Sequence, residues 1–205
     1  MKVFTYDCIV IGTGAAGYSA ANRIKEDGSK SVAIVTEGIG CGTSRNTGSD
    51  KQTYYKLSLC GKDGDSVREM AETLYSGGGV MGEHALCEAA YSTRCFMRLV
   101  ELGVPFPTNE YGEYAGYKTD HDPRTRATSA GPLTSKLMTE CLEAEAERVG
   151  VKIYDKLQVI SILKDGDRVS GVLALNKAAL AEEDRLVLFR ASNVIIATGG
   201  PAGIY

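Results

Sequence analysis

A glycine-rich turn between two apolar runs constrains this chain more than any other feature of its sequence. The run from 6 to 11 reads YDCIVI, which is typical of a buried strand, and the motif Gly-x-Gly-x-x-Gly follows at once over residues 12–17. Residues 15–27 then predict a helix that Gly28 ends, and the apolar run 32–35 predicts a second strand. The beginning of the chain therefore predicts one right-handed strand–helix–strand unit.

The three glycines of the motif have separate expected roles in a dinucleotide site. Gly12 permits the tight turn after the strand, Gly14 lets the backbone approach a pyrophosphate, and Gly17 lets the helix pack closely on the strand. The helix N-terminus directs its unpaired N–H groups and its positive dipole end at the phosphates. Because the flanking strand and helix are both present, the motif favours a nucleotide site over a glycine-rich turn that binds nothing.

An acid at the end of the second strand is expected to hold the ribose hydroxyls. Glu37 lies 20 residues after Gly17, as this fingerprint requires, but Thr36 precedes it and a shifted register would place Thr36 at the ribose instead. An acid at this position argues against a ribose 2′-phosphate, and so against NADP.

Composition excludes several classes of function. The chain has 23 Lys and Arg against 26 Asp and Glu, a net charge of −3, which is unlike the basic surface of a nucleic-acid-binding protein. It has no apolar run long enough to span a bilayer, and its start leaves no room for a signal peptide. None of the six cysteines forms a Cys-x-x-Cys pair, so we expect reduced thiols, no metal site and a cytoplasmic location.

The middle of the chain predicts a polar loop and three helices. Residues 38–49 lack an apolar period and are expected to form a loop. Ser66 and Glu69 predict a capping box for a helix through Leu74, which Gly77-Gly78-Gly79 ends. Two more amphipathic helices are predicted from their apolar faces, which are Leu86, Ala89, Ala90, Thr93, Met97 and Val100 in one, and Leu133, Leu137, Cys141 and Ala144 in the other.

The last third of the chain predicts strands. Its short apolar runs cover residues 151–154, 159–163, 169–175, 186–189 and 194–197, with Asp165-Gly166 as a tight turn. We expect one strand, a small antiparallel meander and a return strand to the main sheet. An NAD domain would continue with regular strand–helix–strand units, so this excursion favours FAD as the dinucleotide.

With these segments in view, the chain resembles the fumarate reductase, succinate dehydrogenase and L-aspartate oxidase superfamily of flavoproteins. The segments that carry the resemblance are DCIVIGTGAAGYSAA, VAIVTEG, LVELGVPF, AGPLTSKLMTECLEAEAERVGVKI, VSGVLAL and NVIIATGGPAGIY. The resemblance implies an α/β fold, a Rossmann-like FAD-binding domain with a parallel sheet core, a β-meander and a helical excursion. Residues 1–205 would then be the N-terminal portion of that domain, without the capping domain and the closing part that follow in relatives.

The resemblance also assigns the residues that hold FAD. The pyrophosphate would lie against Gly12, Gly14, Ala15, Ala16 and Gly17, the ribose against Glu37 or Thr36, the ribityl chain and flavin along Thr43, Ser44, Asn46, Thr47, Gly48 and Ser49, and the adenine beside Val159, Ala197, Thr198 and Gly199. The alternative for residues 43–49 is a solvated surface loop. Membrane-bound relatives attach FAD to a His in this loop, whereas residues 43–46 contain none, so we expect non-covalent FAD.

The catalytic residues are not identified by the sequence. Arg124 and Arg126 are weak candidates for neutralising a reduced flavin or a carboxylate substrate, with ordinary surface arginines as the alternative. His121 is a candidate acid or base, although a solvated loop histidine beside two carboxylates is the simpler interpretation.

The expected activity of the parent enzyme is hydride transfer between flavin and a C–C bond of a carboxylate substrate, with an unknown electron donor or acceptor. Two alternatives remain at this stage, a stand-alone FAD or ADP-binding module without catalysis and an NAD-dependent dehydrogenase domain. In relatives the residues that protonate and clamp the substrate follow the Ala-Thr-Gly-Gly segment, so we expect these 205 residues alone to be inactive.

Overall fold

The structure is a computed structural model that describes residues 1–62, 64–120 and 122–200. These residues form two compact units. The first unit contains Met1–Thr47 together with the chain from Thr139 onward, and the second contains Gly48–Met138. No helix within the described ranges has the length and apolarity needed to cross a bilayer.

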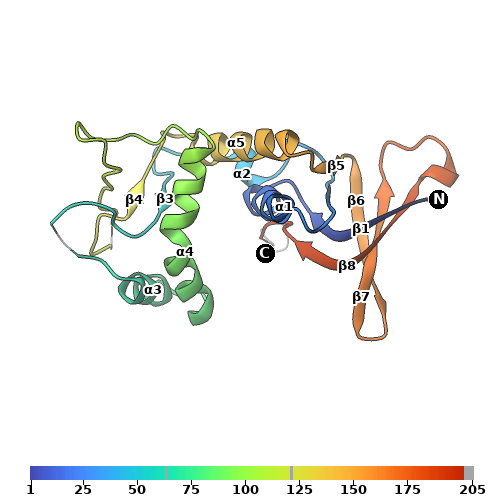
Figure 1. Cartoon of the computed structure of the whole chain (residues 1–205), viewed down its shortest axis with the longest axis horizontal. Coiled ribbons are helices and arrows are strands. Elements are labelled where there is room, and N and C mark those ends of the chain that lie inside the picture. Colours follow the sequence, from blue (N-terminus) through green and yellow to red (C-terminus); the bar gives the residue numbers. More distant parts are fainter. Residues whose placement is uncertain (63, 121, 201–205) are drawn as a thin grey trace. The chain divides into compact units, whose positions relative to one another are not determined.

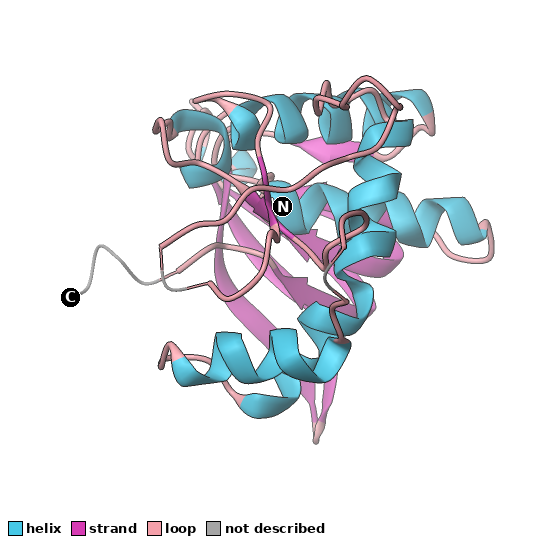
Figure 2. Ribbon diagram, turned by 90° about the vertical axis from the view of Figure 1, so that its left-hand side faces the viewer, coloured by secondary structure: helices cyan, strands magenta, loops and turns pink. Residues whose placement is uncertain are grey.

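The first unit is built on a six-stranded sheet with the order β5-β2-β1-β8-β7-β6 (Figure 1). The strands are β1 (Lys2–Ile11), β2 (Val32–Val35), β5 (Lys152–Tyr154), β6 (Leu157–Asp165), β7 (Arg168–Asn176) and β8 (Leu186–Ile196). Neighbours among β5, β2, β1 and β8 are parallel, whereas β8, β7 and β6 form an antiparallel meander. The predicted parallel core and meander are confirmed, and Figure 2 shows the twist of the long strands.

One continuous strand takes the place of two strands that the sequence predicts. The apolar runs 186–189 and 194–197 predict separate strands, but β8 runs continuously from Leu186 to Ile196. Its first half pairs with β7, while the stretch from Val187 to Ile196 pairs with β1. The apolar pattern breaks at Ser192 and Asn193 because both side chains are exposed and bond to the backbone oxygen of Asp7. The third strand of the meander is therefore also the return strand.

The long helices α1 and α5 belong wholly or partly to this unit. Helix α1 (Ala15–Asp27) ends at Gly28, which has φ +71° and donates its N–H to Lys25, as predicted. Helix α5 (Thr134–Arg148) is joined to α1 by the Asn22 side chain, which donates to the carbonyl of Leu142 over 2.9 Å. The predicted apolar face of α5 is wrong, since its buried residues are Thr134, Thr139, Leu142, Glu145 and Ala146. The Thr134 hydroxyl accepts the N–H of Ala130 and the Thr139 hydroxyl donates to the carbonyl of Ser44, which allows these polar side chains to be buried.

The second unit contains α3 (Val67–Ser76), α4 (Gly82–Glu101) and the short pair β3 (Tyr54–Tyr55) and β4 (Ala127–Thr128). The Ser66 hydroxyl caps α3 by accepting the N–H of Glu69 over 3.1 Å. The Glu69 carboxylate does not complete the predicted capping box, because it accepts hydrogen bonds from Arg124 instead.

The face predicted to be buried on α4 is displaced by one residue. Its buried side chains are Ala85, Ala89, Ser92, Phe96 and Leu99, whereas Leu86 is 52% and Met97 41% exposed. Small residues at 85 and 89 share a buried cluster with Met70 and Ala71 of α3. The Phe96 ring lies 4.7 Å from the ring of Phe106, centroid to centroid. The buried face of α4 is therefore the one whose side chains fit the shape of the neighbouring elements, and not the one with the most large apolar residues.

Candidate functional site

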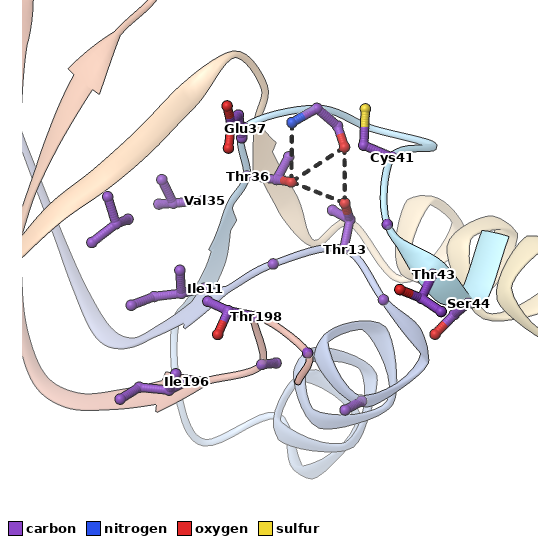
Figure 3. A pocket seen from close by; sticks show the side chains of 18 of the residues that line it. Ile11, Thr13, Val35, Thr36, Glu37, Cys41, Thr43, Ser44, Ile196 and Thr198 are labelled. Carbon is purple, nitrogen blue, oxygen red and sulfur yellow. Dashed lines mark hydrogen bonds between the residues drawn. The ribbon is translucent and has the colours of Figure 1, made fainter. Parts of the chain in front are cut away.

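A cavity of about 690 Å³ opens in the first unit where β1, β2 and β8 end (Figure 3). These strands are parallel, so their carboxyl ends meet at one edge of the sheet. Ligands of open α/β sheets bind in this crevice, and the volume lies within the roughly 300–1,000 Å³ typical of small-molecule sites. The predicted residues that line the cavity are Gly12, Gly14, Ala15, Ala16, Thr36, Glu37, Thr43, Ser44, Val159, Ala197, Thr198 and Gly199.

Two of the motif glycines are required by the fold itself. Gly12 has φ +106°, and a Cβ there would lie 2.5 Å from the carbonyl oxygen of Ala197. A Cβ on Gly17 would lie 2.0 Å from the carbonyl oxygen of Gly12, which is far inside van der Waals contact. The tight turn and the close approach of helix to strand that the sequence predicted are therefore both present.

Gly14 differs from the other two because the protein alone does not require a glycine there. Its φ of −79° suits any residue, and the nearest atom to an added Cβ is the Ser44 Oγ, at an ordinary 3.5 Å. The space in front of this backbone belongs to the cavity. A glycine that the fold does not need, beside open space, fits a backbone that a bound phosphate group approaches closely.

The N-terminus of α1 faces the same cavity and suits an anion. The first N–H groups of any helix lack partners within the helix, and here Gly14 at the N-cap provides no side-chain cap. The first turn also contains no acidic residue. The Ala15 N–H donates to the Ser44 Oγ over 3.3 Å. The positive end of the helix dipole and the N–H groups of the first turn beyond Ala15 together favour a phosphate at this position.

Thr36 uses its hydroxyl inside the protein. Its Oγ1 lies 2.9 Å from the Thr13 Oγ1, and both hydroxyls lie within 3.3 Å of the carbonyl oxygen of Gly38, a triangle that Figure 3 shows with dashed lines. Thr36 also donates its backbone N–H to Tyr154. Sequence reasoning missed Thr13 and Gly38, because neither occupies a fixed position of the glycine motif.

Glu37 lies on the cavity wall apart from this triangle (Figure 3). Its carboxylate is exposed and forms an ion pair with Lys177, which follows the end of β7. Sequence reasoning missed Lys177, because 140 residues separate it from Glu37. Of the two ribose candidates, Glu37 has a carboxylate at the cavity surface, whereas the Thr36 hydroxyl is already surrounded by protein partners.

The polar loop after β2 contains an unpredicted helical turn, α2 (Thr43–Asn46). Only the beginning of this turn, at Thr43 and Ser44, lies on the cavity lining within the described residues. Asn46 donates its side-chain amide to the carbonyls of two loop glycines, and the Thr47 hydroxyl donates to the carbonyl of Thr43. Asn46 and Thr47 thus brace the loop rather than line the cavity.

The remaining predicted flavin residues, Gly48 and Ser49, belong to the second unit. The Ser49 N–H donates to the carbonyl of Pro132 over 2.9 Å. Neither residue is on the cavity lining.

The opposite wall of the cavity comes from the chain after β8 and from the start of β6. The Ala197 N–H donates to the carbonyl of Ile11 over 2.9 Å, which sets the Ala-Thr-Gly-Gly segment beside the glycine-rich turn. The Leu157 N–H donates to the carbonyl of Thr36, so β6 begins beside the end of β2. Leu157 and Gln158 line the cavity next to the predicted Val159, and sequence reasoning missed both.

The two candidate arginines lie in the second unit and are held by carboxylates. Arg126 is fully buried and donates to both carboxylate oxygens of Asp65 over 2.9 and 2.7 Å. Its Nη1 also donates to Tyr55, Thr73 and Asp122. Arg124 forms a two-pronged pair with Glu69. His121 lies outside the described residues.

The buried pair of Asp65 and Arg126 lowers the pKa of the Asp65 carboxyl. Burial alone would raise the pKa, but the hydrogen bonds from Arg126 and from the backbone of Ser58 and Ser66 outweigh it and lower the pKa to about 2. The carboxylate is therefore ionised at neutral pH and matched to a fully buried guanidinium.

The described part of the chain contains neither a candidate metal site nor a disulfide. No group of three or more His, Cys, Asp or Glu side chains is arranged there to hold a metal ion. The six cysteines, all within the described residues, are free thiols.

Comparisons with known proteins identify this architecture. A family model described as FAD binding domain matches residues 7–203. L-aspartate oxidase of Vibrio cholerae is 24% identical over 97% of this chain and 38% of its own length. A fumarate reductase (CoM/CoB) subunit of Methanothermobacter marburgensis is 27% identical over 100% of this chain and 37% of its own length.

Solved structures agree at the level of the fold. A quinol fumarate reductase from E. coli matches with a TM-score of 0.85 and 20% identity, covering 100% of this chain and 34% of that one. The chain thus spans a little over a third of the length of the curated relatives named above. Because the family match runs through nearly all of its residues, the chain belongs to the FAD binding domain family, of the type found in L-aspartate oxidases, fumarate reductases and succinate dehydrogenases.

Proposed function

We propose that the cavity holds FAD non-covalently, with the pyrophosphate at the N-terminus of α1. The observation that carries this placement is Gly14, a glycine the fold does not require, with the cavity before it and the cap-free start of the helix beside it. Glu37 would accept hydrogen bonds from the ribose hydroxyls, and the adenine would lie between Val159 and the segment from Ala197 to Gly199. FAD would supply the redox chemistry, while these residues bind and orient it.

We further propose that the whole protein is an oxidoreductase acting on a C–C bond of a carboxylate substrate, with an electron donor or acceptor still to be identified. The names of the relatives, which include fumarate reductase and L-aspartate oxidase, support this substrate class. The family match from 7 to 203 runs through both compact units, which supports residues 1–205 as one part of an FAD domain. The six free thiols support a cytoplasmic location.

The placement of the pyrophosphate is tested by replacing Gly14 with Val and titrating FAD and ADP by calorimetry. The added side chain occupies the space proposed for the phosphates, so both affinities should fall at least tenfold, a loss of about 1.4 kcal/mol. Gly82→Val, at an exposed position outside the cavity lining, is the matched control. Unchanged affinity in Gly14→Val would disprove the placement.

The non-covalent attachment is tested by acid precipitation of the flavin-loaded protein. Residues 43–46 contain no His, so the yellow colour should remain in the supernatant. A yellow pellet above a colourless supernatant would show a covalent bond.

The family match favours FAD over the NAD-dependent alternative. A binding module without catalysis is the second candidate, because neither Arg124 nor Arg126, the two candidate arginines, is among the residues lining the cavity. Turnover of carboxylates by the whole protein, measured against free flavin, separates an enzyme from a module.

A further inference from the structure

Arg45, within α2, joins the loop at the cavity to a helix nearly 100 residues away in sequence. Its guanidinium forms ion pairs with two acids of α5, Glu143 through Nη2 and Glu140 through Nη1, the latter over 3.5 Å. The Arg45 and Glu143 side chains are each only 18% exposed. Water therefore screens this pair less than it screens pairs on the open surface.

A second contact ties the same turn to α5. The Thr139 hydroxyl donates to the carbonyl of Ser44 over 3.3 Å. Helix α5 is itself attached to α1 through the Asn22 side chain and the carbonyl of Leu142. The turn α2, helix α5 and helix α1 are thus connected through side chains, and the residues that make these contacts all belong to the first unit.

The residue next to Arg45 is the one that reaches the start of α1. The Ser44 Oγ accepts the Ala15 N–H, and Ser44 lies on the cavity lining. A hydroxyl that accepts one hydrogen bond still has its own O–H to donate. At this position the O–H can be directed at an oxygen of the pyrophosphate, beside the N–H groups of the helix.

Arg45 itself is not on the cavity lining, and two carboxylates surround its guanidinium. Its positive charge is therefore matched inside the protein rather than directed at a phosphate. This arrangement argues for an effect through Ser44 and against direct contact with the ligand.

We propose that Arg45 is a positioning residue, whose ion pairs with Glu143 and Glu140 hold α2 so that the Ser44 hydroxyl meets the pyrophosphate of FAD. The inference rests on the proposed function, because it requires the pyrophosphate to lie at the N-terminus of α1. Its signature is a selective loss of affinity, in which ligands with a pyrophosphate weaken and ligands without one do not.

The test is calorimetric titration of the purified protein with adenosine, ADP and FAD. In Arg45→Met, the affinities for ADP and FAD should each fall about tenfold, the size of one weakened charge-assisted hydrogen bond, while adenosine binding stays unchanged. Glu143→Gln should shift the same two ligands in the same direction by a smaller factor. The control is Arg148→Met, because Arg148 also pairs with an acid of α5, is 70% exposed and lies outside the cavity lining.

Two further variants keep the proposal testable if Arg45→Met does not fold. Arg45→Lys retains the charge without the planar fork, and its affinities should be intermediate. The exchange Arg45→Glu with Glu143→Arg re-forms the pair in reverse and should restore most of the affinity for ADP.

The outcomes separate the two proposals. ADP binding by the wild-type protein, with unchanged affinity in Arg45→Met and Arg45→Lys, overturns the role of Arg45 alone. Equal weakening of adenosine, ADP and FAD also overturns it, because that result indicates a general structural effect. Failure of the wild-type protein to bind ADP overturns both the placement of the pyrophosphate and the role of Arg45.

Discussion

The cavity of the first unit and the surroundings of Arg126 in the second unit differ in whether the protein itself provides partners for its hydrogen-bond donors. In the first unit the cavity is surrounded by small residues such as Gly14, Ala15 and Ser44, and the helix N-terminus beside them has no side-chain cap. In the second unit a buried arginine, Arg126, is surrounded by carboxylate and hydroxyl acceptors. One region presents donors to a ligand, and the other uses its donors within the fold.

The comparison shows why charge alone is a poor guide to a binding site. Arg126 is a strong cation, but bringing a guanidinium out of water is so costly that it needs partners, and its partners are Asp65 and Asp122. Lys56 is also fully buried, and burial lowers its pKa, which weakens its charged form. The backbone N–H groups of a helix start carry only partial charges, so they can remain unpaired at a cavity without that cost.

The largest expected effect is on the buried pair of the second unit. Asp65→Ala leaves Arg126 without its two-pronged partner and should lower the free energy of unfolding by about 3–5 kcal/mol, measured by urea denaturation at pH 7. Asp65 has a pKa of about 2, below the ordinary value of about 3.9. Its contribution is therefore complete above about pH 4 and is lost as the pH falls towards 2.

The pH dependence gives this prediction its control. The wild-type protein should lose stability between pH 4 and pH 2 by more than the Asp65→Ala variant does. Parallel pH profiles for the two proteins would contradict the role of Asp65, and would remove the contrast between the units.

A smaller effect is expected from the glycines of the first unit. Gly17→Ala places a Cβ 2.0 Å from the backbone oxygen of Gly12 and should lower the free energy of unfolding by about 1–3 kcal/mol. Gly14→Ala meets its nearest atom at 3.5 Å and should change stability by less than about 0.5 kcal/mol. Thermal denaturation of both variants measures the difference, and equal losses would show that both glycines serve the fold.

The ribose contact distinguishes Glu37 from Thr36. Glu37→Gln should reduce the preference for ADP over 2′-deoxy-ADP by up to about tenfold, because a carboxylate accepts hydrogen bonds more strongly than an amide. Thr36→Val should leave that preference unchanged and lower stability instead, because its hydroxyl contacts Thr13 and Gly38. Calorimetry with both nucleotides decides, and the reverse pattern would assign the ribose to Thr36.

The smallest effect is expected for Arg124. Its side chain and that of Glu69 are both partly exposed, so Arg124→Ala should cost less stability than Asp65→Ala does in the same denaturation experiment. With excess FAD, reduced viologen and fumarate, the chain should show no turnover above free flavin, before or after this substitution. Turnover that Arg124→Ala abolishes would instead place a working site within these 205 residues.

Much of the first unit was predictable because its signals are local. A short stretch of chain contains the turn at Gly12, the helix from Ala15 to Asp27 and the strand from Val32 to Val35. In such a stretch, neighbouring residues determine both the backbone conformation and the period of the apolar side chains. The cap at Ser66 was predictable for the same reason.

The errors lie where distant residues decide which face is buried. The apolar count favoured Leu86 and Met97 on α4, but the small side chains of Ala85 and Ala89 allow closer packing with α3. The apolar pattern divides the strand β8 in two because Ser192 and Asn193 interrupt it, although pairing with β1 keeps the strand continuous.

By itself the sequence determined the nucleotide-binding turn, the first strand–helix–strand unit and the family of flavoproteins that the chain resembles, because these depend on residues close together or on motifs in a fixed order. The tertiary structure alone decided that Arg126 is buried against Asp65, that Lys177 meets Glu37 and that Arg45 joins α2 to α5. These pairs link residues 61, 140 and 98 positions apart. No local pattern records such partners, because only the folded backbone brings opposite charges close enough to offset the cost of removing them from water.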